Sequence, residues 1–173
     1  MRRRAAFSLA ALPLLVTSPL AAQEEEVSVA RAAELTVVNL INLFRLDHGL
    51  RPLELDPTLT DLARARSSDM ANRGYFGHYT PEGQHGPHLL QAQLAGGPYT
   101  AENLGVTGEG YETAMWSLFD EWVASPTHLF YILRPEFNWL GVGVAEAPTP
   151  FQSVTFKIVT QVFVEQRGPI RRV

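Results

Sequence analysis

The spacing of hydrophobic residues changes along this 173-residue chain, and that change limits the fold more than any other feature. Over the first two thirds, apolar residues recur three and four positions apart, which is the period of an amphipathic helix. In the last third they alternate with polar residues, as in a strand with one buried face. The pattern predicts helices over 29–44, 57–73, 111–122 and 126–133, a short helical turn over 88–94, and strands over 139–145 and 154–164.

Local signals support these boundaries. Asp56 is an N-cap residue before a proline at the first helical position, and Gly74 is a stop signal. The segment 74–88 is rich in glycine and proline and is therefore predicted to be a loop. Helices followed by a hairpin indicate an α+β domain in which helices cover an antiparallel sheet. Because two strands alone are marginally stable, we expect a third strand, best placed over 99–106.

The first 22 residues have the organisation of an export signal: three arginines, a short apolar run and a small-residue cleavage site. The apolar run is about a dozen residues long and contains Pro13, whereas a bilayer span needs roughly 20 residues. An uncleaved amphipathic anchor is the alternative. We expect residues 1–22 to be a signal peptide and the mature protein to be secreted or periplasmic, with no membrane-spanning segment.

Charge and cysteine content exclude several classes of function. The chain has 14 Lys and Arg against 18 Asp and Glu, and loss of the three signal arginines takes the formal net charge from −4 to −7. Such a chain lacks the basic surface that holds a phosphate backbone, so we expect no nucleic-acid partner. The absence of cysteine excludes disulfides, thiolate-bound zinc, Cys-bound iron–sulfur clusters and a cysteine nucleophile.

Common catalytic motifs are also absent. The sequence has no Gly-x-Ser-x-Gly, no His-Glu-x-x-His and no P-loop. Gly141-Val142-Gly143 begins like a dinucleotide fingerprint, but Glu146 stands where the third glycine belongs. We expect these glycines to allow another part of the chain to approach the strand closely.

The five histidines differ in context. His48 ends the first predicted helix, where an imidazolium complements the helix dipole. His85 and His88 stand three apart in a predicted loop; such a pair can bind a metal, but without a helix to fix the spacing a solvated loop is favoured. His78 follows a helix stop, and His128 falls in the first turn of a capped helix, so both are suited to presenting a side chain.

Glu102 is the acid that stands out, because it lies inside the predicted strand 99–106, where a buried carboxylate needs a partner. The acids Asp120 and Glu121 are predicted to be on the surface. Spacing alone does not bring Glu102 together with His78 and His128, since 24 and 26 residues separate them.

Taken in order, seven segments resemble the CAP superfamily of cysteine-rich secretory, antigen 5 and pathogenesis-related proteins, in its short cysteine-free bacterial form. The segments are Asn39 to Leu53; Leu59 with Ala63, Arg66 and Met70; Phe76-Gly77-His78; Ala101-Glu102-Asn103-Leu104; Trp122 with Ser125-Pro126-Thr127-His128; Leu140-Gly141-Val142-Gly143; and Thr160-Gln161-Val162-Phe163. The resemblance implies an α-β-α sandwich with a central three-stranded antiparallel sheet over residues 35–166. An extension over 23–34 precedes this domain and a tail over 167–173 follows it.

The resemblance also implies a site. In the family two histidines and two acids line one cleft, and the matching positions here are His78, Glu102 and His128. This sequence lacks the family's second acid at the matching position, which falls near Ser125. Glu121 would point from another part of the helix face. This departure puts in doubt any mechanism that needs two carboxylates. Leu129 stands where the bacterial branch usually has arginine, so the cleft rim is expected to be less positive.

Two classes of function follow as expectations. The first is an extracytoplasmic binding module, a monomer whose cleft holds a divalent metal or a small lipid-like or cell-surface ligand. The second is a metal-dependent, protease-like hydrolase with Glu102 as the candidate catalytic residue; a serine mechanism through Ser125 is a weaker variant. Zn²⁺ or another divalent ion would rest on His78, His128 and Glu102, unless Glu102 only orients a histidine. A hydrogen-bonded polar cluster without metal is the remaining alternative.

Overall fold

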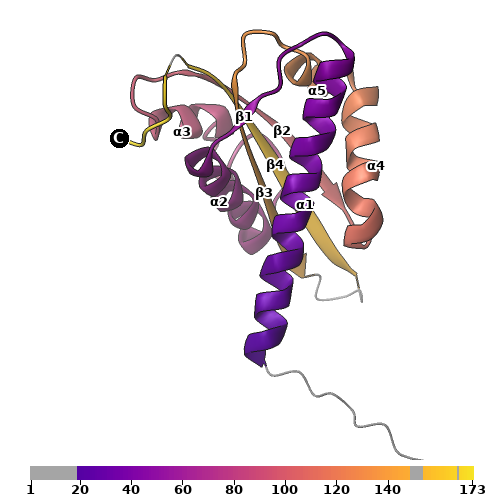
Figure 1. The fold of residues 1–173 in the computed structure, drawn as a ribbon. Coiled ribbons are helices and arrows are strands. Elements are labelled where there is room, and N and C mark those ends of the chain that lie inside the picture. Colours follow the sequence, from indigo (N-terminus) through magenta and orange to yellow (C-terminus); the bar gives the residue numbers. More distant parts are fainter. Residues whose placement is uncertain (1–18, 149–153, 167) are drawn as a thin grey trace, which may run out of the picture.

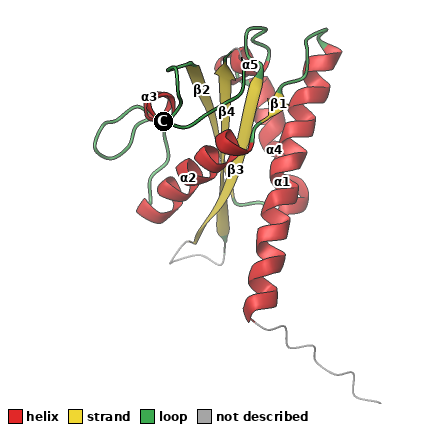
Figure 2. Ribbon diagram, turned by 60° about the vertical axis from the view of Figure 1, so that its left-hand side comes forward, coloured by secondary structure: helices red, strands yellow, loops and turns green. Residues whose placement is uncertain are grey.

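The computed structural model describes residues 19–148, 154–166 and 168–173, which form a sheet between two layers of helices (Figure 1 and Figure 2). Helices α1, α4 and α5 cover one face of the sheet, and α2 and α3 cover the other. The predicted α-β-α sandwich is therefore confirmed. In chain order the elements are α1 (Pro19–Asp47), β1 (Glu54–Leu55), α2 (Pro57–Arg73), α3 (Gly86–Ala92), β2 (Tyr99–Thr107), α4 (Tyr111–Ala124), α5 (Pro126–Ile132), β3 (Trp139–Pro148) and β4 (Thr155–Glu165).

The sheet has the order β1-β3-β4-β2, and its three long strands, β3, β4 and β2, pair with one another in antiparallel fashion. The strand predicted over 99–106 is confirmed as β2. The expected count of three strands is corrected, because a two-residue strand, β1, pairs in parallel with β3. The backbone N–H of Glu54 donates to the Asn138 carbonyl at 2.9 Å, and that of Asp56 donates to Leu140 at 3.0 Å. A two-residue strand is too short for an alternating pattern to reveal.

Helix α1 begins at Pro19, ten residues before the predicted start. Residues 19–28 are mostly Ala, Gln and Glu, which are strong helix formers, but they lack the apolar period on which the prediction rested. Residues 1–18 of the predicted signal peptide lie outside the described residues. In the parts of the chain that are described, no helix combines the length and apolar character needed to cross a bilayer.

Helix α2 packs directly on β3. Its predicted caps are confirmed: the Asp56 carboxylate accepts from the Leu59 N–H at 2.9 Å, and Gly74 has the left-handed φ of 67°. A Cβ at Gly141 would collide with the backbone of Leu59, and one at Gly143 would collide with that of Arg64. The two glycines therefore let helix and strand backbones meet, as their sequence context predicted.

The opposite face of the sheet is sealed by a large apolar core under α1 and α4, with Trp122 at 1% exposure. Its indole N–H donates to the Leu104 carbonyl at 2.8 Å. Arg45 is equally buried and donates to four backbone carbonyls, of which those of Ile132 and Arg134 lie 2.8 and 3.0 Å away. Arg45 thus ties the end of α1 to the chain that leaves α5.

Candidate functional site

The candidate site is built around β2, which is an edge strand of the sheet. Successive side chains of a strand point to opposite faces, so Glu102 points toward α2 and α3, while Asn103 points toward α5. The chain that follows α2 closes over the first of these faces. Segments distant in sequence thereby meet around one strand.

Glu102 is almost fully buried, at 2% exposure, and both of its carboxylate oxygens are engaged. Arg66 on α2 donates from Nε to Oε2 at 3.3 Å, and His78 Nδ1 lies 2.9 Å from Oε1. A Cβ at Gly86 would overlap the carboxylate, so only glycine fits at the start of α3. The sequence-based expectation that Glu102 is buried and needs a partner is confirmed.

Arg66 also donates hydrogen bonds to groups other than the Glu102 carboxylate. It donates from Nη1 to the Tyr75 hydroxyl at 2.5 Å and from Nη2 to the Gly77 carbonyl at 2.6 Å. The Tyr75 hydroxyl in turn donates to Asp69, and burial raises the pKa of this tyrosine. The fork of Arg66 therefore fixes the chain immediately before His78. Sequence reasoning placed Arg66 on a helix face but did not identify it as the partner of Glu102.

His78 is held at its backbone and at one ring nitrogen. Its carbonyl accepts from the Gly86 N–H at 2.7 Å, and its Nδ1 faces the Glu102 carboxylate. A carboxylate next to Nδ1 favours the tautomer that carries its proton there, which leaves Nε2 with a free lone pair in the neutral ring. The imidazole is 44% exposed, so part of the ring is open to a ligand.

His128 lies on α5, on the other side of β2. Asn103 donates to the His128 carbonyl and to Gln161 Oε1, both at 3.1 Å, and so pins α5 to the sheet. Within the described residues His128 Nδ1 is buried and has no hydrogen-bond partner. Burial lowers the pKa of His128, and nearby His78 lowers it further. The geometry brings His78 to Glu102, but it does not bring His128 into contact with that carboxylate.

His85 and His88 also belong to this site, contrary to the expectation of a solvated loop. Helix α3 begins at Gly86, two residues before the predicted turn, so His85 is its N-cap and His88 lies in its first turn. The two rings are 4.7 Å apart. His85 is half-buried, and its pKa is lowered by burial and then by His88. Their spacing is therefore fixed by a helix, which the glycines and prolines of 74–88 obscured.

These side chains line a cleft of about 360 Å³ between α3, β2 and α5. Hydrogen-bonding groups and aromatic rings dominate its wall, which includes His78, His85, His88, Gln91, Tyr99, Thr100, Glu102, Thr127 and Tyr131. Burial raises the pKa of Tyr131, so its phenol stays protonated at neutral pH. The cleft thus presents donors and acceptors on rings and hydroxyl groups, above a carboxylate that is already paired.

The ligand set of His78, Glu102 and His128 stays a prediction. In residues 19–148, 154–166 and 168–173, no three His, Asp or Glu side chains stand close enough together to hold an ion. Glu102 is committed to Arg66 and His78, so it orients an imidazole and is not free as a direct ligand. The unpartnered Nδ1 of His128 is the feature of this donor set that fits an absent ligand.

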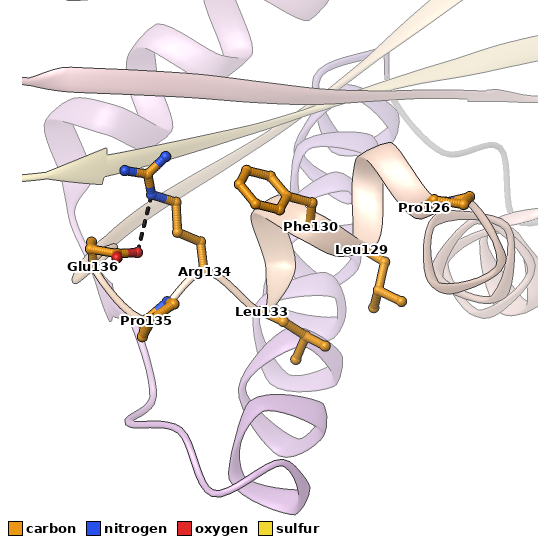
Figure 3. Close-up of a pocket in the computed structure, with 7 residues that line it drawn as sticks. All are labelled: Pro126, Leu129, Phe130, Leu133, Arg134, Pro135 and Glu136. Carbon is orange, nitrogen blue, oxygen red and sulfur yellow. Dashed lines mark ion pairs between the residues drawn. The ribbon is translucent and has the colours of Figure 1, made fainter.

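Other predicted positions lie away from the cleft wall. Ser125 joins α4 to α5 and makes no capping hydrogen bond through its side chain, and Glu121 is exposed on α4. Leu129 lines a different hollow, of about 640 Å³, on the outer side of α5. Figure 3 shows Leu129 and Leu133 pointing the same way there, with Arg134 and Glu136 paired at 3.2 Å. This hollow is apolar, in contrast to the cleft.

Comparisons with known proteins agree with this fold. The chain is 35% identical over 122 residues to the uncharacterized protein YkwD of Bacillus subtilis, covering 69% of this chain and 45% of that protein. It is 25% identical over 130 residues to the uncharacterized membrane protein YlbC of the same organism, covering 75% of this chain and 36% of that protein. The chain therefore spans less than half the length of these curated relatives.

Two solved structures share the fold at lower identity. An extracellular protein containing a SCP domain from Bacillus anthracis has a TM-score of 0.62 at 21% identity, over 90% of this chain and 45% of that one. An outer surface protein from Borrelia burgdorferi has a TM-score of 0.58 at 17% identity, over 80% of this chain and 96% of that one. The sequence model of the cysteine-rich secretory protein family, CAP, matches residues 38–163. The chain therefore belongs to the CAP family.

Proposed function

We propose that this CAP domain is an extracytoplasmic binding module whose cleft takes a small polar ligand from a cell surface. The observation that carries the proposal is the cleft wall, where imidazoles and phenols surround a carboxylate already neutralised by Arg66. Rings with polar tips suit a ligand that has hydroxyl groups and a flat apolar face, such as a cell-surface saccharide. A lipid-like ligand is less well matched by this wall and better matched by the apolar hollow of Figure 3.

Two further observations support a location outside the cytoplasm. The first 22 residues read as an export signal. The structural relatives are described as an extracellular protein and an outer surface protein, which is said of them and extended to this chain as part of the proposal.

The metal-dependent hydrolase has less support from the geometry. A hydrolytic role needs Glu102 to bind an ion or to accept a proton from water. Its two oxygens are instead held by Arg66 and His78. A divalent ion here would rest on imidazoles, that of His78 in the cleft wall and that of His128 on α5, whose Nδ1 has no partner within the described residues.

Binding of solubilised cell-wall saccharides, followed by NMR shift mapping and calorimetry, tests the proposal. Tyr99→Ala and His78→Ala should each weaken binding about tenfold or more, whereas Phe130→Ala is the matched control. Phe130 is 58% exposed and lines the outer hollow, and it is not among the residues of the cleft wall. Shifts confined to the hollow, with affinity lost in Phe130→Ala and kept in Tyr99→Ala, would overturn the proposal in favour of an apolar ligand.

The metal alternative has its own test. Metal analysis of purified protein should give an occupancy that falls in His78→Ala and His128→Ala if the imidazoles of the cleft hold an ion. Equal occupancy in the parent and both variants would remove these two histidines from any metal site. Peptide cleavage abolished by a chelator would favour the hydrolase over the binding module.

A further inference from the structure

His85 and His88 are two imidazoles with nitrogen atoms that the fold leaves unused. Within the described residues, no hydrogen bond or ion pair engages either side chain, and the two rings contact each other and the ring of Tyr79. The Nδ1 atom of His85 is buried without a partner. A buried polar atom without a partner costs free energy, so its retention calls for an explanation.

The backbone around His85 holds this pair in place. Tyr79 and His85 form a β-bridge, and the His85 carbonyl accepts from the Leu89 N–H at 3.1 Å. The Tyr79 ring also contacts the His85 ring, with the ring centroids 5.0 Å apart. His88 follows at the third position of α3, so the turn of the helix sets the separation of the two imidazoles.

The two rings meet at a centroid distance of 4.7 Å and an interplanar angle of 75°. The N-cap and the third position of α3 thus bring both imidazoles side by side at the start of the helix. They open into the cleft, where water can complete the coordination of an ion. Neutral imidazoles suit divalent transition ions, and Cu²⁺ leads that series in affinity.

We propose that His85 and His88 form a two-imidazole site for a divalent transition ion, at the α3 rim of the cleft. The site is separate from the His78 and His128 donors considered above, and it does not depend on the proposed saccharide binding. The remaining coordination positions are taken by water.

Titration of the folded domain with Cu²⁺, read by calorimetry and by the nitrogen hyperfine pattern in electron paramagnetic resonance, tests the site. The expected result is one equivalent bound with two imidazole nitrogens. His88→Ala removes a direct ligand. It should therefore weaken Cu²⁺ binding by at least about 10- to 100-fold, which is the loss caused by removing a residue that only hydrogen-bonds to a metal ligand. Because His88 is exposed, this variant should fold, and an unchanged melting temperature without metal verifies it.

His48→Ala is the control and should keep its affinity for Cu²⁺, while His78→Ala and His128→Ala test the competing donors. Binding that survives His88→Ala and His85→Ala but is lost in His78→Ala or His128→Ala would overturn the inference. Binding lost in none of the five variants, or a single-nitrogen spectrum in the parent, would overturn it too. Failure of saccharide binding leaves these outcomes unaffected, so the two proposals fail separately.

Discussion

Arg66 Nε lies 3.3 Å from Glu102 Oε2, and the two side chains are only 5% and 0% exposed. The pair joins the middle of α2 to the edge strand β2, beneath the cleft. Breaking a buried pair by removing one partner costs about 3–5 kcal/mol, because the other charge is left uncompensated. We therefore expect Arg66→Met to lower the free energy of unfolding by about this amount in urea titrations.

A double variant separates charge from packing. Arg66→Met combined with Glu102→Gln should be more stable than Arg66→Met alone, because no buried charge remains unpaired. Glu82→Gln is the matched control, since Glu82 pairs with Arg73 on the surface, where solvent screens the two charges. A double variant no more stable than Arg66→Met would show that packing, and not the charge, accounts for the loss.

Gly143→Ala should be among the most damaging small substitutions in the chain. The added methyl group would meet the backbone of Arg64 in α2, which cannot move aside like a side chain. We expect a loss of about 3 kcal/mol or more, the upper end of the cost of overpacking. Gly110→Ala, where a Cβ has nothing within 4 Å, is the control for thermal unfolding. Equal losses in both variants would contradict the close contact.

Arg45→Lys should destabilise the fold although it preserves charge. The guanidinium donates to several carbonyls at once, and an ammonium cannot reproduce that fork. A buried acceptor left without a donor costs about 1–3 kcal/mol, so we expect a loss of at least about 2 kcal/mol. Arg51→Lys, on an exposed side chain, is the control in the same denaturant titration. A neutral Arg45→Lys would mean that the carbonyls find other donors.

Stability should depend on pH through His128. Because burial lowers its pKa in the folded state, the unfolded chain binds this proton more tightly. Stability therefore rises with pH between the folded pKa and the ordinary value of about 6.5. The contribution of neutral His128 is complete above about pH 7.5 and is lost as pH falls below about 6.5 and through the folded pKa.

Urea midpoints measured from about pH 7.5 to about pH 5 check this dependence. His128→Gln should flatten the slope, and His85, whose pKa is also lowered, should account for part of what remains. An undiminished slope in His128→Gln would contradict the assignment.

The sequence predicted the layers of the fold because they depend on period. Alternation in β4 and the helical spacing in α1, α2 and α4 are properties of neighbouring residues. β1 was missed because two residues carry no period, and the start of α1 was missed because its first turns lack one. The start of α3 was obscured by the glycines and prolines around it.

The site was predicted only in part, for a different reason. A buried carboxylate at Glu102 follows from its place in a strand, but its partner Arg66 is 36 residues earlier on a separate helix. The local sequence places Arg66 among the apolar residues of one helix face, but it does not show which acid Arg66 meets. Pairings between distant segments depend on how elements pack, which a pattern of neighbouring residues does not encode.

The strand pairing of the sheet also bears on the order in which parts of this molecule can fold. Glu102 lies opposite Val162 in β4, and Glu54 lies opposite Trp139 in β3, so the cleft strand has no partner until β4 is present. Pairings this distant in sequence are slow to form, because a long loop must close before any contact stabilises it. Helices α2 and α4 can form early, but the cleft is expected to be among the last features to acquire its shape. A folding chain that pauses before β4 would therefore expose β2 as an unpaired edge, the kind of surface that promotes aggregation.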